Sequence, residues 1–222
     1  MKIFVDGPTA NPENNHPSCM NCEADKHALY SDAYPSKLLL NGAVKQIKVR
    51  EIAVGGDDFV LAAANPSAEE EEEDFASEVV YKLALLENHS NLQDVTDFYD
   101  KKQAEKDCKA WFKKVLFPYI KKQTEAGHSK DDLKDISKKA QTFIQNVFGK
   151  KDKENPSKSI ASKYNDCKAV RNESFGEDGE FNSAWMFVFD EDQDTDASNK
   201  EAWDARIKYV WVFPYGQEEV KY

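Results

Sequence analysis

The stretch AAANPSAEEEEED, from Ala62 to Asp74, passes from small apolar residues through an Asn-Pro turn into five consecutive glutamates. Glutamates in series repel one another and bury little apolar surface, so they do not offset the entropy that is lost when a chain is ordered. We therefore expect residues 62–77 to form a mobile acidic loop. This interpretation describes the physics of the segment and leaves its function open.

The composition around this loop predicts one globular domain with segregated charge. The chain has 222 residues, 40% of them hydrophobic, which is enough for one sizeable core, so we expect a single domain over residues 1–222. The formal net charge is -11, yet residues 101–158 contain sixteen lysines and only eight acidic residues. An acidic protein avoids nucleic acid and anionic membranes, whereas its basic segment favours an acidic protein partner.

Hydrophobic residues at helical spacing follow the acidic loop. They recur every three or four residues in two groups, at Phe98, Cys108, Trp111, Phe112, Val115, Leu116, Tyr119 and Ile120, and at Leu133, Ile136, Ala140, Phe143, Ile144 and Val147. Pro118 either kinks the first helix or ends its regular part. Ser129 is a typical N-cap for the second helix, and Gly149 is a typical stop. The pattern predicts an antiparallel helical hairpin over about 96–149, with Cys108 as a core residue.

The remaining periodic segments favour β-strands. They are residues 2–5, two runs within 37–53, and residues 59–61, 77–86, 184–189 and 207–213. The two runs flank Asn41-Gly42, a dipeptide that suits a two-residue hairpin turn. The layout is sheet, helical hairpin, sheet, which is an α+β fold.

Motifs of known catalytic chemistry are absent from the sequence. It has no nucleophile elbow, no phosphate-binding glycine loop and no His-Glu-x-x-His pair, so we expect the protein not to be an enzyme. The first residues, MKIFVD, lack the apolar segment of a signal peptide. We therefore expect a cytoplasmic protein with reduced cysteines, and export without a signal peptide stays open.

A cluster near the N-terminus raises the question of zinc. His16, Cys19, Cys22 and His27 are four ligand types that zinc accepts, within twelve residues. Structural zinc sites usually draw ligand pairs from two separate arms, and no second Cys-x-x-Cys pair exists here. The spacing favours an irregular loop over a zinc site.

An acidic run near the C-terminus has the ligand order of a calcium loop. Counting from Asp190, positions 1, 3, 5, 7, 9 and 12 of an EF-hand loop correspond to Asp190, Asp192, Asp194, the carbonyl of Asp196, Ser198 and Glu201. Position 6 is Thr195, where the tight turn of such a loop needs glycine. We expect at most a weak calcium site, with a dissociation constant of roughly 10⁻⁴ to 10⁻³ M. The alternative is a solvated hairpin loop.

The basic hairpin provides candidate partner-binding residues. Lys109, Lys113, Lys134 and Lys138 lie on its predicted outer faces, where an acidic partner such as a tubulin tail would be attracted in a salt-dependent way. The alternative is an ordinary solvated lysine surface.

Several short motifs, in this order, resemble the translationally controlled tumour protein family. The stretch at 62–70 resembles the first signature of that family. Other matching stretches are MKIF at 1–4, YSD at 30–32, REIA at 50–53, NH at 88–89, LQ at 92–93, KYVWVF at 208–213 and GQEEVKY at 216–222. The resemblance covers most of the chain. At the second signature of the family the match is eroded, because residues 169–173 read AVRNE where an aromatic pair followed by Gly-Glu is expected.

The resemblance implies a twisted, tent-like β core, similar to Rab-binding exchange-factor-like proteins, with a protruding helical hairpin. It implies a non-enzymatic monomer that binds calcium, tubulin or microtubules and translation elongation factors, and that acts in growth or survival. The family also carries an acidic residue implicated in contacting a Rheb-type GTPase. The matching position here is Ala28, and Glu23 and Asp25 are near enough to replace it. The alternatives are a small-GTPase regulator or chaperone that acts through the β-tent groove, and a helical scaffold without metal.

Overall fold

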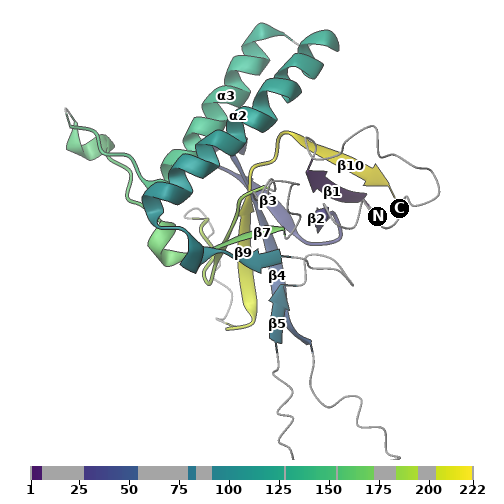
Figure 1. Ribbon diagram of the computed structural model, residues 1–222, viewed down its shortest axis with the longest axis vertical. Helices are drawn as coiled ribbons and strands as arrows, with labels where there is room; N and C mark the ends of the chain where they lie inside the picture. The colour runs from purple at the N-terminus through teal and green to yellow at the C-terminus, as the bar shows by residue number, and fades with distance from the viewer. Residues whose placement is uncertain are drawn as a thin grey trace, which may run out of the picture.

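The computed structural model describes residues 2–6, 28–54, 80–83, 92–127, 129–153, 155–172, 184–194 and 204–221. Figure 1 shows a helical hairpin that projects from a body of β-strands, with the two ends of the chain close together. The acidic loop at 62–77 and the expected strand at 59–61 lie outside the described residues.

The described strands form two antiparallel sheets. The small sheet has the order β10-β1-β2, with β1 at Lys2–Asp6, β2 at Ala28–Ser31 and β10 at Gln217–Lys221. The large sheet has the order β3-β4-β9-β8-β7-β6, and β5 pairs with β4 off this path. Its strands are β3 (Ser36–Leu39), β4 (Val44–Val54), β5 (Val80–Leu83), β6 (Leu92–Asp94), β7 (Lys168–Asn172), β8 (Met186–Phe189) and β9 (Ile207–Val212).

The helical hairpin consists of α2 (Lys101–Glu125) and α3 (Lys130–Phe148). Asp100 caps α2, and Ser129 caps α3 by accepting a hydrogen bond of 3.2 Å from the backbone N–H of Asp132. Helix α2 continues through Pro118, and α3 stops at Gly149, which has a φ of 84°. None of the described helices is both long and apolar enough to cross a membrane.

Strand alternation gives the large sheet two different faces. Phe187 of β8 and Trp211 of β9 are register partners on one face, where the ring of Phe187 lies 6.0 Å from that of Phe143 in α3. The helices cover this side, which we call the helix face. Val188 and its register partner Val210 point to the other side, called the opposite face below.

The helical hairpin and its buried residues agree with the sequence prediction, except at Phe98. The prediction for Phe98 is wrong, because it lies in the 3-10 helix Thr96–Phe98 that precedes α2 and its side chain is 67% exposed. Cys108 is fully buried, and Trp111 is only 6% exposed. The β3–β4 connection differs from the expected two-residue turn, because it contains four residues. Three of them have positive φ, namely Leu40 at 52°, Asn41 at 55° and Gly42 at 79°. A leucine is sterically disfavoured at positive φ, so the sequence pattern did not predict that Leu40 belongs to the turn and indicated a shorter one.

Candidate functional site

All four candidate partner-binding lysines are exposed on the helical hairpin. They are Lys109, Lys113, Lys134 and Lys138. Lys109 pairs with Glu105, and Lys134 lies 3.3 Å from Asp131. Lys113 and Lys138 have no ion pair among the described residues, so their charges are available to a partner.

A buried polar cluster joins this hairpin to the large sheet. Arg171 of β7, whose side chain is 1% exposed, donates a hydrogen bond of 2.9 Å to Asp107 of α2. The indole N–H of Trp185 donates to the same carboxylate oxygen at 3.0 Å, and the Arg171 guanidinium lies 4.6 Å from the centre of the Trp185 ring. Because Asp107 neutralises a buried cation, this contact sets the position of α2 on the sheet.

The first candidate calcium ligand, Asp190, lies on the opposite face. Lys208 shares that face with Val210, two residues further along β9. The Lys208 ammonium lies 2.6 Å from the Asp190 carboxylate and 4.0 Å from the Glu51 carboxylate. Asp190 is thus already paired with a cation from its own chain.

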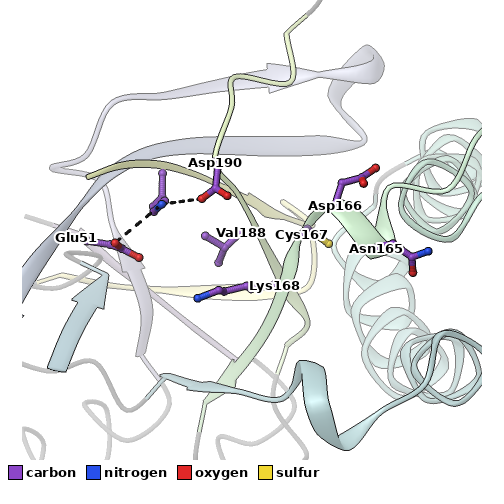
Figure 2. Close-up of a pocket in the computed structure, with 8 residues that line it drawn as sticks. Glu51, Asn165, Asp166, Cys167, Lys168, Val188 and Asp190 are labelled. Carbon is purple, nitrogen blue, oxygen red and sulfur yellow. Dashed lines mark hydrogen bonds and ion pairs between the residues drawn. The ribbon is translucent and has the colours of Figure 1, made fainter. Parts of the chain in front are cut away.

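The same residues border a polar cavity of about 310 Å³. Figure 2 shows Glu51 and Asp190 on one side and Asn165 and Asp166 on the other, with Val188 and Lys168 between them. The lining consists of Glu51, Asn165, Asp166, Cys167, Lys168, Val188, Asp190 and Lys208. The cavity carries carboxylates and ammonium groups together, so it suits a polar group of a partner better than an apolar one.

Asp192 and Asp194 are held on the helix face instead. Lys37 of β3 lies 2.9 Å from a carboxylate oxygen of each of them. Gln46, the register partner of Lys37, donates a hydrogen bond of 2.7 Å to Asp192 and accepts one of 2.9 Å from the indole N–H of Trp211. Since Trp211 belongs to the helix face, so does this cluster.

Lys37 and Asp192 shift each other's pKa in the directions that are expected for an ion pair. Burial alone would raise the pKa of the Asp192 carboxyl, but hydrogen bonds from the Asp194 N–H, Lys37 and Gln46 hold it below its ordinary value. Desolvation alone would lower the pKa of Lys37, but its hydrogen bonds to the two aspartates raise it overall. Both groups are therefore charged at neutral pH, and Lys37 acts as an internal counter-cation.

The described part of the calcium loop therefore does not fit a calcium ion in this arrangement. Asp190 is on one face of the sheet, whereas Asp192 and Asp194 are on the other. Among the described residues, no group of three or more aspartate, glutamate, histidine or cysteine side chains could hold a metal ion. The other candidate ligands, Asp196, Ser198 and Glu201, lie outside the described residues. Calcium binding by the whole loop stays a prediction.

Several other candidate residues also lie outside the described residues. They are the zinc candidates His16, Cys19, Cys22 and His27, and the GTPase-contact candidates Glu23 and Asp25. Ala28 begins β2, where it pairs with Val5 of β1.

The two described cysteines are core residues. Burial raises the pKa of the Cys108 thiol far above its ordinary value, and it raises that of Cys167 to about 12. Both thiols stay protonated at neutral pH and are poor nucleophiles.

Sequence reasoning missed Lys37, Gln46 and Arg171. They come from strands far along the chain from the acidic residues that they contact, and none belongs to a recognisable motif. Only a correct strand register would have paired them.

Comparisons with known proteins give a consistent result. A family model described as translationally controlled tumour protein matches residues 24–197. The homologue from Wuchereria bancrofti is 29% identical over 124 residues, which cover 55% of this chain and 65% of that protein. Homologue 1 from Dictyostelium discoideum is 29% identical over 124 residues, covering 56% and 68%. The chain thus matches slightly less than two thirds of the length of the first of these relatives.

Solved structures show the same architecture. The translationally controlled tumour-associated protein of Schizosaccharomyces pombe superposes with a TM-score of 0.53 and 16% identity over the full length of both chains. The protein of this type from Caenorhabditis elegans superposes with a TM-score of 0.54 and 22% identity, covering 100% of this chain and 99% of the other. At these identities the likeness shows the fold, and it confirms the expected α+β architecture with a helical hairpin.

Proposed function

Because the chain belongs to the translationally controlled tumour protein family, we propose that it is a non-enzymatic interaction protein that binds acidic segments of partner proteins through its helical hairpin. Tubulin tails are the first partner to test. Translation elongation factors are further partners, and the proposed roles lie in growth or survival. We place this activity in the cytoplasm and assign it to the monomer.

The exposed lysines of the hairpin support this proposal. Lys109, Lys113, Lys134 and Lys138 are all solvent-exposed, although the protein as a whole carries a net charge of -11. An acidic protein with one basic projection attracts an acidic partner to that projection and repels it elsewhere. The net charge of -11 repels nucleic acid and anionic membranes from the rest of the surface, so we propose a protein partner instead of either of these.

Co-sedimentation with microtubules tests the proposal. Changing Lys109, Lys113, Lys134 and Lys138 to glutamate should abolish binding at low salt, and raising the salt should weaken binding by the unchanged protein. Removing the acidic tubulin tails by limited proteolysis should have the same effect as the substitutions.

The connector after α3 offers a matched control. Lys150, Lys151, Lys153 and Lys158 are also exposed, so changing them to glutamate alters the net charge equally without touching the hairpin. Equal loss of binding in both variants would contradict the proposal, since it would show that only net charge matters.

A second candidate function is regulation of a Rheb-type small GTPase, or chaperone activity, through the groove of the β-tent. The cavity between Glu51 and Asp166 favours it, because this polar hollow lies on the face of the sheet away from the helices. Nucleotide exchange by the GTPase, measured with and without the protein, tests the regulator. Lys168→Glu, at an exposed position in the cavity wall, should change that rate, and an unchanged rate would remove the cavity from the function.

A further inference from the structure

Four lysines of α2 form a straight ridge, which we call the lysine ridge. They are Lys102, Lys106, Lys109 and Lys113, and all four are exposed. Their spacing of four, three and four residues places them within an arc of roughly 60° on a helix of 3.6 residues per turn. With a rise of 1.5 Å per residue, the ridge is about 16 Å long.

The lysine ridge points away from the rest of the protein. Among the α2 residues whose burial is described, the buried ones are Ala104, Cys108, Trp111 and Phe112, on the side of the helix that faces the sheet. They centre about half a turn away from the ridge lysines. The ammonium groups are therefore presented to solvent along one line.

This line of charge has little internal compensation. Lys109 pairs with Glu105, whereas Lys102, Lys106 and Lys113 have no ion pair among the described residues. Like charges three or four residues apart destabilise a helix. The ridge thus costs stability, and a polyanionic partner would remove that cost.

An exposed aromatic residue lies just before the ridge. Phe98 ends the short 3-10 helix Thr96–Phe98 and is 67% exposed, the most exposed of the large hydrophobic residues described. It precedes Lys102 by four residues, so it stands near the N-terminal end of the ridge. A large exposed ring four residues before a row of cations suits a partner that combines negative charge with an apolar side chain.

We propose that the lysine ridge and Phe98 bind an extended acidic segment of a partner protein that carries an apolar residue at one end. In an extended chain every second side chain points the same way, about 6.6–6.8 Å apart. The ridge lysines are about 4.5 to 6 Å apart along the helix axis. Alternate glutamates can therefore each approach one ammonium group. The proposal rests on the proposed function and narrows it from the whole hairpin to one face of α2.

Fluorescence anisotropy with two labelled peptides tests the ridge and Phe98 separately. One peptide has four glutamates alternating with serine, and the other carries an added leucine at one end. The triple variant Lys102→Glu, Lys106→Glu, Lys113→Glu should weaken binding of both peptides by about tenfold or more, equivalent to 1.4 kcal/mol. Phe98→Ser should weaken binding of the leucine peptide alone.

Three exposed lysines of the connector after α3 give the matched control. The variant Lys150→Glu, Lys151→Glu, Lys158→Glu makes the same charge change and should weaken both peptides by less than about threefold. Equal weakening of peptide binding by the two triple variants would overturn the assignment of the binding site to the lysine ridge. Ridge-dependent binding that is tighter for single-stranded RNA or anionic vesicles than for the peptides would overturn the proposed partner.

If both peptides bind through the ridge but microtubules do not bind, the inference holds and tubulin is excluded as the partner. If microtubules bind equally well to both triple variants, the inference fails while the proposed function stands.

Discussion

Asp190 and Asp192 are separated by one residue, yet they pair with lysines on opposite faces of the large sheet. Asp190 accepts from Lys208 at 2.6 Å, and Asp192 accepts from Lys37 at 2.9 Å. Strand β8 ends at Phe189, so the chain after it is no longer held by strand pairing and reaches both faces of the sheet. The start of the acidic run is therefore fastened to both sides of the sheet by internal cations.

The pKa of Asp192 should depend on Lys37 and not on Lys208. We expect an NMR titration of the Asp192 carboxyl carbon to give a pKa below the ordinary 3.8, and Lys37→Met should raise it. Because the folded pKa is depressed, the pair contributes stability above the ordinary aspartate pKa and loses it as the pH falls through the lower folded value. Lys208→Met is the control, since Lys208 contacts Asp190 on the other face. An equal effect of both variants would contradict the assignment.

Calcium affinity should rise when the internal cation is removed. In the unchanged protein, Lys37 competes with calcium for Asp192 and Asp194, so amide shifts at 190–194 should respond weakly or not at all. Lys37→Met should tighten binding by about tenfold or more, equivalent to 1.4 kcal/mol. Adding Asp192→Asn to that variant should abolish the gain. Identical titrations for the unchanged protein and Lys37→Met would show that Lys37 does not control a calcium site.

Trp111 should contribute more to folding by packing than by hydrogen bonding. It is 6% exposed and packs edge-on against Phe112 with ring centroids 5.0 Å apart, so Trp111→Ala should cost about 3–5 kcal/mol in chemical denaturation. The indole nitrogen has no hydrogen-bond partner among the described residues, so Trp111→Phe should cost clearly less. Equal costs for the two variants would point to an indole hydrogen bond. Exposed Lys113→Ala, the control, should change the free energy of unfolding by under about 0.5 kcal/mol.

Breaking the Arg171–Asp107 pair should destabilise the attachment of the hairpin. Asp107→Asn leaves the buried Arg171 guanidinium without its carboxylate. Loss of one partner of a fully buried pair costs about 3–5 kcal/mol, and because Asp107 is 33% exposed we expect about 2–3 kcal/mol. Arg50 and Asp204 form the surface control at 3.8 Å, with side chains 60% and 40% exposed. Asp204→Asn should change stability by less than about 1 kcal/mol. A cost for Asp107→Asn no larger than that of this control would argue against an anchoring role.

Two glycines with nearly the same φ should respond differently to alanine. Gly127, in the turn between the helices, has a φ of 86°, and among the described residues beyond its chain neighbours no atom lies within 4 Å of an added Cβ, so Gly127→Ala should cost about 1 kcal/mol. Gly149 has a φ of 84°, and a Cβ there would lie 3.0 Å from the Ile160 carbonyl oxygen and 3.0 Å from the Ser162 nitrogen. Gly149→Ala should therefore lower the melting temperature more than Gly127→Ala, and the reverse order would contradict the described end of α3.

Features that depend on neighbouring residues could be predicted from the amino-acid sequence alone. Hydrophobic residues recur every three or four positions around Cys108 and Trp111 in the first helix and around Phe143 in the second. This spacing predicted the helices, because helical periodicity brings such residues onto one face. The Ser129 cap and the Gly149 stop were predictable because each bonds to residues within one turn. Family motifs then indicated the α+β architecture, which the structural comparisons show.

The pairing of charged side chains, in contrast, depends on how distant strands come together in the folded protein. The ligand order from Asp190 to Glu201 predicted six oxygens around one ion, but that order assumes that the loop folds on itself. Pairing of β3 with β4 and of β4 with β9 instead brings Lys37 and Lys208 to opposite faces beside these carboxylates. Likewise, β7 carries Arg171 beneath Asp107, 64 residues away. Such contacts depend on strand register between distant segments, and a one-residue shift in register would move each side chain to the other face.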